Sequence, residues 1–435
     1  MHEPLDLLHK AIYDDDPASV RAVLHDHPGL TSTINDALPH GPFGQTALLA
    51  AVKKRNLEIV DLLIAAGADI QIGSHWWAGS FNVLDEVDAA FLPALLERGA
   101  RMTPHAAARL GMLDRLRELI AAHPSAVHER GGDGQLPLHF ARTVEIADFL
   151  LGSGADIDAI DVDHESTAAQ WMLGDVVDGD YRRSRHDVAR FLVSRGCRTD
   201  VLMAAALGDE VLVRRQLDAD PACVRTRVTP QWFPMKDARA GGTIYIWTLG
   251  AYLSAPLVAK KFGHEDVFAM LMDRSPFEQK LVVACALGDE AGVRSLLASR
   301  PDGPREPSDE DRRLIVDAAE MNRTETVRLM LEAGWPADSR GKHGATALHW
   351  AGFHGNAEMV SGILKHRPPI DARSLEFDGT PLEWTLYGSR EGWHRETGDY
   401  AAAAEAQLDA GAAIPADTNA SDPVRDLLRR YNRRG

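Results

Sequence analysis

Apolar residues in this chain recur at the spacing of an amphipathic helix. Val327, Met330 and Leu331 occupy positions i, i+3 and i+4, and residues 59–63 carry the same arrangement. Such a period places the apolar side chains on one helix face, which must be buried against a neighbour. The pattern predicts an all-α chain built from many short helices.

One kind of helical unit consists of two helical runs, a tight turn between them and a proline after the second. It occupies residues 8–28, 106–124, 204–221 and 284–301, and the spacing from the turn to the proline is the same in all four. The turn residues are Asp15, Gly111, Gly208 and Gly288. A unit that returns unchanged indicates a repeat architecture.

A second kind of unit opens with Gly-x-Thr and closes with Gly-Ala-Asp. Its cleanest copy is residues 44–70, it returns at 134–159 and 344–372, and a stretched copy covers 379–412. These units resemble the ankyrin repeat, whose pattern is T-P-L-H-x-A-A, a glycine turn, V-x-x-L-L and G-A-D. The resemblance extends over nearly the whole chain. It is strong at 44–70, 132–160 and 341–374, and degenerate at 73–102 and 225–262.

The resemblance implies an all-α ankyrin-repeat solenoid of about twelve helix pairs, each stable only when stacked on its neighbours. We expect one array over residues 1–435, with a cap repeat at 1–30, repeats over 31–414, and a C-terminal helix with a basic tail at 415–435. Threonine suits the start of a helix because its side chain accepts a backbone N–H. We assign this role to Thr46, Thr167, Thr346 and Thr380. His139 and His349 stand where the family uses histidine to tie neighbouring repeats.

Three connections are long for this fold: residues 29–43, 172–186 and 225–242. Compact domains rarely carry long irregular loops without a function. The segment 225–242, with Gln231-Trp232-Phe233-Pro234, is either a functional finger or a tolerated insertion.

Tryptophans follow a regular pattern in these units. Trp171, Trp247, Trp350 and Trp384 each lie four residues after a threonine, which places them on the first helix of a repeat. They either pack between adjacent helices or form the aromatic floor of a concave groove, which suits a peptide side chain, a sugar or a planar molecule. The candidate contact residues are His75, Trp76, Trp77, Trp171, Trp232, Phe233, Tyr245, Trp247, Trp350, Trp384 and Trp393.

Catalytic motifs for nucleophilic, zinc-dependent or phosphate chemistry are absent from the sequence. Glu383 occupies the place where the family often has histidine. If the groove were an active site, Glu383, His394 and Asp399 would be its acid and base, without a cofactor. Such an enzyme, or a small-molecule binder, is the alternative to a binding scaffold.

The charge of −17 over 435 residues argues against nucleic-acid and membrane partners, which select basic surfaces. Three cysteines without metal spacing predict no metal site and a reducing, cytoplasmic compartment. We therefore expect a protein or peptide partner, bound through the concave face and the loop fingers, because this fold mostly supplies recognition.

Overall fold

The protein is described from a computed structural model that covers residues 3–174, 185–300 and 309–433. The described chain is helical, as predicted, and its only β-pairing there consists of isolated antiparallel bridges. The fold separates into two compact units, Met1–Leu271 and Met272–Gly435. Much of the predicted loop 172–186 lies outside the described residues.

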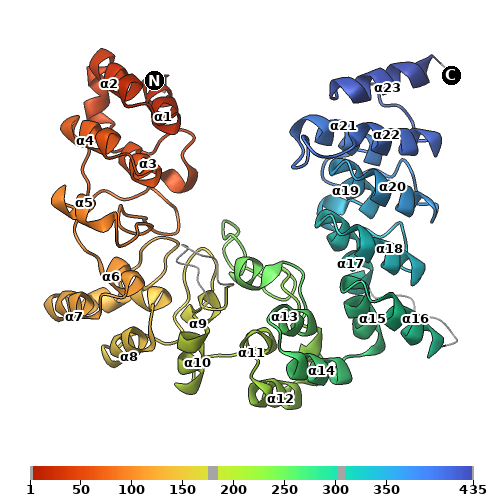
Figure 1. Cartoon of the computed structure of the whole chain (residues 1–435), viewed down its shortest axis with the longest axis horizontal. Helices are drawn as coiled ribbons and strands as arrows, with labels where there is room; N and C mark the ends of the chain where they lie inside the picture. Colours follow the sequence, from red (N-terminus) through yellow and green to blue (C-terminus); the bar gives the residue numbers. More distant parts are fainter. Residues whose placement is uncertain (1–2, 175–184, 301–308, 434–435) are drawn as a thin grey trace. The chain divides into compact units, whose positions relative to one another are not determined.

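The first unit contains paired helices joined by loops and short 3₁₀ turns (Figure 1). Its α-helices are α1 (Glu3–Tyr13), α2 (Pro17–Asp26), α3 (Ala47–Lys54), α4 (Leu57–Ala65), α5 (Leu92–Glu97), α6 (Pro104–Leu110), α7 (Leu113–Ala122), α8 (Val144–Gly152), α9 (Ala168–Trp171), α10 (His186–Ser194), α11 (Val201–Leu207), α12 (Glu210–Ala219), α13 (Ala255–Lys261) and α14 (Glu265–Arg274), the last of which crosses the boundary. First helices pack on first helices, as α1 does on α3 and α11 on α13.

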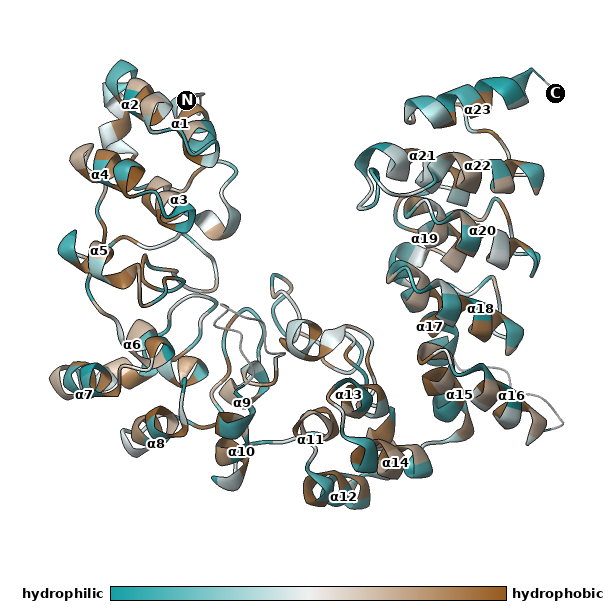
Figure 2. Cartoon of the chain, viewed as in Figure 1, coloured by the Kyte–Doolittle hydropathy of each residue, from teal (hydrophilic) through white to brown (hydrophobic). Residues whose placement is uncertain are grey.

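The second unit repeats this arrangement. Its helices are α15 (Phe277–Ala286), α16 (Glu290–Ala298), α17 (Asp309–Glu320), α18 (Thr324–Glu332), α19 (Ala347–Phe353), α20 (Ala357–Leu364), α21 (Pro381–Glu391), α22 (Tyr400–Asp409) and α23 (Asp422–Asn432). α17, α19 and α21 stack in one row, and α18, α20 and α22 in a second. The terminal α23 is mostly hydrophilic on the side seen in Figure 2, as a capping helix requires.

The turns between paired helices explain the residues found there. Asp15, Gly111, Gly208 and Gly288 all have positive φ, between 57° and 79°. Glycine adopts this left-handed conformation without steric cost, and it ends a helix for that reason. The prolines that follow the second helix at 28, 124 and 221 each begin a 3₁₀ turn, which stops the helix and directs the chain to the next repeat.

All four predicted threonines begin a helix, but only the hydroxyls of Thr46 and Thr380 accept a backbone N–H. The hydroxyl of Thr167 donates to Gln170, and that of Thr346 faces the Nδ1 of His349. Thr46 is the N-cap of α3 and its hydroxyl accepts the Leu49 N–H, while Thr167, Thr346 and Thr380 are the N-caps of α9, α19 and α21. In the degenerate region, residues 73–91 form no helix, so α5 has no partner of its own repeat there.

The prediction for Trp247 was wrong about its position. Thr243 begins no first helix, and Trp247 lies in a π-helical turn, Ile246–Gly250, where it is 51% exposed. The first helix of that repeat is α13, whose N-cap is Ser254. Thr243 and Trp247 have the same spacing as the other threonine–tryptophan pairs, but they lie within an inserted segment, residues 226–253. This segment ends where Ser254 pairs with Arg227.

Candidate functional site

An aromatic groove of about 730 Å³ lies in the second unit. It is formed by α19, α21, the loop before α21 and residues 417–419 before α23. Trp350 is central: its ring lies 5.2 Å from Trp384, nearly perpendicular, and 6.0 Å from Trp393, nearly parallel. Three of the predicted contact residues therefore meet in one cavity.

The groove combines buried and exposed rings. Trp350 is only 3% exposed, whereas Phe377, Tyr387 and Trp393 are 60%, 54% and 63% exposed. The indole Nε1 of Trp350 is buried and donates no hydrogen bond to any described residue. A buried donor without an acceptor costs about 1–3 kcal/mol of stability.

Charged groups line the rim of the groove. The Arg373 Nε donates to Asp378 at 2.7 Å, and this ion pair lowers the pKa of the aspartate. The Nε of Arg390 is buried and donates no hydrogen bond within the described chain; the guanidinium has only a 3.8 Å contact with Glu391. A ligand carbonyl or carboxylate would satisfy it.

The proposed acid and base are not assembled in this groove. Glu383 lines the cavity, but its carboxylate accepts the backbone N–H of Thr380 at 2.6 Å and completes a capping box. Asp399 is the N-cap of α22 and accepts the Ala402 N–H at 3.0 Å. His394 lies against His354, with ring centroids 5.1 Å apart, and does not line the groove.

Glu383 is the third residue after the N-cap of its helix, and the residues at the same position in other repeats show its structural role. In two other repeats this residue is histidine: His139 and His349 each accept a backbone N–H through Nδ1 and face a carbonyl oxygen of the next repeat through Nε2, at Ser166 and Gly379. Burial lowers the pKa of both imidazoles to about 4, so they remain neutral. The predicted tie between repeats is confirmed.

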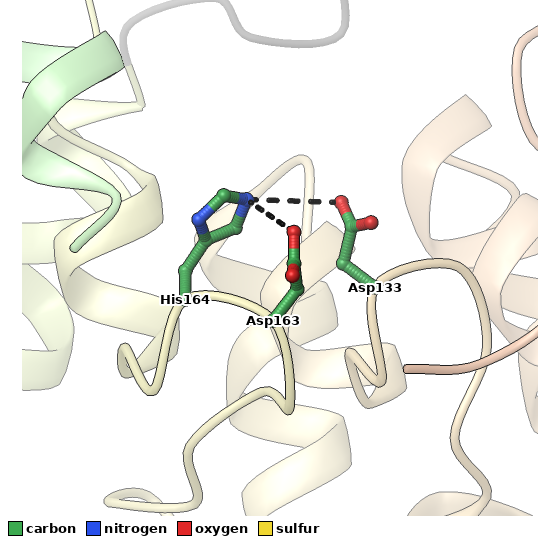
Figure 3. A group of neighbouring side chains, drawn as sticks. All are labelled: Asp133, Asp163 and His164. Carbon is green, nitrogen blue, oxygen red and sulfur yellow. Dashed lines mark ion pairs between the residues drawn. The ribbon is translucent and has the colours of Figure 1, made fainter. Parts of the chain in front are cut away.

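A second cluster of polar side chains lies in the first unit, and it was not predicted from the sequence. It is formed by two adjacent fingers, which are the loops that precede the first helical turns of successive repeats. Asp133, Asp163 and His164 bring ligand atoms within 4.8 Å of one another (Figure 3). Asp133 and His164 both lie three residues before the N-cap of their repeats, at Leu136 and Thr167. Equivalent positions of stacked repeats are neighbours in space, and this register was the signal that could have found the cluster.

Aromatic rings predicted as contact residues surround this cluster. The ring of His164 lies 5.2 Å from Trp171 and 4.9 Å from Trp247. Trp171 is buried and donates through Nε1 to Asp161 at 2.8 Å. The structure thus places Trp171 and Trp247 beside one imidazole, although they belong to different segments.

Electrostatics at the cluster are governed by burial. Burial raises the pKa of Asp133 to about 6; nearby His164 opposes this, and the carboxylates of Asp163 and Asp161 add to it. Burial also raises the pKa of Asp161, against the effect of the Trp171 N–H. Three carboxyl groups therefore share a poorly solvated region.

The remaining predicted residues are distributed over other contacts. Tyr245 is fully buried in the core and donates to Asp200 at 2.8 Å, and the half-buried Phe233 packs edge-on against it at 5.3 Å. Trp232 is half-buried. The finger 73–81 holds His75, whose Nε2 lies 3.0 Å from the Asn35 carbonyl oxygen.

Trp76 and Trp77 are adjacent in that finger and half-buried, with ring centroids 6.0 Å apart. Trp76 packs edge-on against Phe43 at 5.0 Å. The guanidinium of Arg239 lies 4.3 Å above Trp77, which connects the finger to the inserted segment.

Comparison with known proteins identifies the repeats. The family model "Ankyrin repeats (3 copies)" matches residues 281–374, and the model "Ankyrin repeat" matches 43–74 and 133–162. Of the described helices, none is long and apolar enough to cross a membrane.

Three curated proteins share sequence with the chain. "Ankyrin repeat domain-containing protein SAT10" of Stachybotrys chartarum is 24% identical over 399 residues, which is 80% of this chain and 20% of that protein. "Palmitoyltransferase Hip14" of Drosophila melanogaster is 31% identical over 97 residues, 22% of this chain and 15% of its own length. "Putative palmitoyltransferase ZDHHC13" of Danio rerio is 26% identical over 94 residues, 19% of this chain and 15% of its own length. The chain thus spans a fifth or less of each.

Proposed function

Because this chain is an ankyrin-repeat protein, we propose that it binds a protein partner by taking an extended peptide segment into the aromatic groove of the second unit. Ankyrin repeats generally mediate protein–protein interaction. The observation that carries the proposal is that Trp350, whose indole N–H is buried and unpartnered, lines a cavity bordered by exposed rings. A backbone carbonyl of a peptide is the acceptor that such a donor requires.

The exposed rings supply the apolar part of recognition. Phe377, Tyr387 and Trp393 present more than half of their surfaces to solvent, around a floor made by Trp350 and Trp384. Aromatic side chains bury large areas at a low entropic cost, and they dominate the energetics of interfaces. An apolar or aromatic side chain of the partner would lie between them.

The charges favour one feature of the peptide. Arg373 is paired with Asp378, whereas the buried Nε of Arg390 lacks an acceptor. An acidic side chain or a carbonyl beside the apolar residue would complete the coordination of Arg390, because a guanidinium binds a carboxylate through several N–H groups.

A displayed random-peptide library panned against the full chain tests the proposal. The dissociation constants of enriched peptides are then measured with wild-type protein, with Trp393→Ala and with Trp247→Ala, a similarly exposed tryptophan outside the groove. We expect Trp393→Ala to weaken binding at least tenfold and Trp247→Ala to leave it unchanged. Equal affinity for all three proteins would reject the groove as the peptide site.

The alternative is a small ligand, such as a sugar or a planar molecule, in the same cavity. It is tested by a thermal-shift screen of metabolites on the same three proteins. Stabilisation of wild type and Trp247→Ala, but not of Trp393→Ala, together with no enriched peptide, would favour the alternative over our proposal.

We also infer a reducing, cytoplasmic location, which the cysteines support. Cys197 and Cys285 are buried and unpaired, and burial raises the pKa of their thiols to about 11 and about 12, so neither is a reactive thiolate. Recovery of a fluorescently tagged chain mainly in an oxidising compartment would contradict this.

A further inference from the structure

We propose that Asp133, Asp163 and His164 form a binding site for a divalent transition-metal cation such as Zn²⁺ or Mn²⁺. The three residues lie on two successive fingers of the first unit and point toward a common centre (Figure 3). One imidazole and two carboxylates are a donor set that such ions accept. This site is separate from the peptide groove of the second unit.

The tautomer of His164 is the first argument. Its Nδ1 lies 2.7 Å from the carbonyl oxygen of Gly242, which can only accept, so Nδ1 carries the proton. In the neutral ring, Nε2 then presents a lone pair. That nitrogen lies 3.5 Å from an oxygen of Asp163 and 4.0 Å from an oxygen of Asp133. Lone pairs that converge in this way repel one another unless a cation lies between them.

Burial makes this arrangement costly without a cation. The side chain of His164 is 10% exposed and that of Asp163 is 8% exposed, and no hydrogen bond is made by the Nε2 of His164 in the described structure. The Oδ2 of Asp133 faces His164, while its Oδ1 is buried and makes no hydrogen bond of good geometry; the Trp76 indole N–H acts on this carboxyl and partly offsets the rise in its pKa. Removing a carboxylate from water without a partner is strongly unfavourable, whereas a metal ion satisfies the lone pairs of all three residues together.

The distances are compatible with coordination. Zinc binds nitrogen and carboxylate oxygen at about 2.0–2.2 Å, so two ligand atoms on one ion lie at most about 4.4 Å apart. Both separations from the Nε2 of His164 satisfy this limit, and all three ligand atoms lie within 4.8 Å of one another, so only a small shift of the carboxylates is needed to bind one ion. Hard cations such as Mg²⁺ prefer a shell of oxygen atoms. The imidazole nitrogen should therefore favour Zn²⁺ or Mn²⁺ over Mg²⁺ at this site.

The groups around the ligands hold them in place. The carbonyl of Gly242 orients the imidazole, and the N–H of Gly241 donates to the Oδ1 of Asp163 at 3.2 Å. The carbonyl of Asp133 accepts the N–H groups of Val162 and Asp163, both at 3.0 Å, which joins the two fingers. Such outer-shell hydrogen bonds are typical of metal sites. A bound ion would therefore fasten the inserted segment 226–253 to the repeats.

Calorimetric titration of the full chain, first stripped with a chelator, tests the proposal. ZnCl₂ and MnCl₂ are the probes, with MgCl₂ for selectivity, and each is added to wild type, Asp133→Asn and His343→Gln. His343 is the matched control because it also lies three residues before an N-cap, Thr346, but in the second unit. We expect one site of Zn²⁺ or Mn²⁺ per wild-type chain, at least tenfold weaker in Asp133→Asn and unchanged in His343→Gln.

Thermal unfolding with and without ZnCl₂ separates a metal ligand from a structural residue. In the stripped protein, Asp133→Asn should unfold at the same temperature as wild type or above it, because it removes a buried carboxylate. Added Zn²⁺ should raise the unfolding temperature of wild type and of His343→Gln, but not of Asp133→Asn. Equal binding by wild type and Asp133→Asn would show that the ion binds elsewhere, and a wild type that binds no ion would show that there is no site; either result would overturn the proposal. Neither result bears on peptide binding.

Discussion

The carboxylate of Glu383 accepts the backbone N–H of Thr380 at 2.6 Å, and the Thr380 hydroxyl accepts the N–H of Glu383 at 3.2 Å. This reciprocal pair satisfies two N–H groups at the start of α21. A residue that the sequence suggested as a catalytic acid or base therefore has a definite structural role.

Replacing Glu383 distinguishes the two roles. Glu383→Ala should reduce the free energy of unfolding by about 1 kcal/mol because it removes half of the capping box. Glu383→Gln should cost much less, since its amide oxygen still accepts the Thr380 N–H, as Gln170 does for Thr167 at 2.8 Å. Denaturant titration of the three proteins measures this. An equal loss in both variants would show that the cap contributes nothing.

The stability of the fold should depend on pH through His349. Burial lowers its folded pKa to about 4, from an ordinary value of 6.5, and the bond to Gly379 and the charge of Arg340 act in opposite directions. The unfolded chain therefore takes up a proton that the folded chain refuses as pH falls from about 6.5 to about 4. Stability is full above this window and is lost within it, by about 3 kcal/mol for this one residue.

His349→Gln tests this dependence, because glutamine can still cap the helix but cannot titrate. Unfolding free energies at pH 7 and pH 4 are compared for both proteins. We expect the variant to be somewhat less stable at pH 7, where it lacks the bond to Gly379, and to lose less on acidification. The same decline in both proteins would show that His349 is not responsible.

Trp350→Phe separates packing from hydrogen bonding in the aromatic groove. Phenylalanine keeps an aromatic ring in the groove but lacks the indole N–H that has no acceptor. Enriched peptides should bind this variant about fivefold to tenfold more weakly, as expected for one lost hydrogen bond. Tight binding that is unaffected would show that the peptide backbone does not contact Trp350.

The stacked core should respond to Leu348, which is fully buried on α19. Leu348→Ala removes buried methyl groups and leaves a cavity, at a cost of about 2–5 kcal/mol. Val211→Ala is the control, because Val211 is 78% exposed and its loss should change stability by less than about 0.5 kcal/mol. Thermal or denaturant unfolding measures both. A small effect of Leu348→Ala would contradict tight packing between α19 and its neighbours.

Features that depend on neighbouring residues could be predicted from sequence. The Thr346 cap and the His349 tie lie within a single T-x-L-H unit, so their spacing carries the information. The same spacing gave a wrong prediction for Trp247, because Thr243 lies four residues before it but belongs to an insertion and begins no first helix. Its exposure could not be read from spacing alone.

The cluster at His164 forms only because neighbouring repeats stack, and the sequence of a single repeat contains no information about this contact. Asp133 and His164 come from different repeats, and the carbonyl of Gly242 that orients the imidazole comes from a third segment. Recognising them requires the register between repeats. The groove at Trp350 was partly foreseeable, but the rings at Phe377 and Tyr387 reach it from a loop and from the far end of α21.

The inserted segment also changes how this chain should fold. A repeat array acquires most of its contacts between nearby residues, so it can form by stepwise addition of repeats at low contact order. The hydrogen bond from Gly241 to Asp163 joins residues 78 apart, as does that from His164 to Gly242. Both must wait for a large loop to close, so the finger tips should gain protection from hydrogen exchange later than α11 and α13 during refolding.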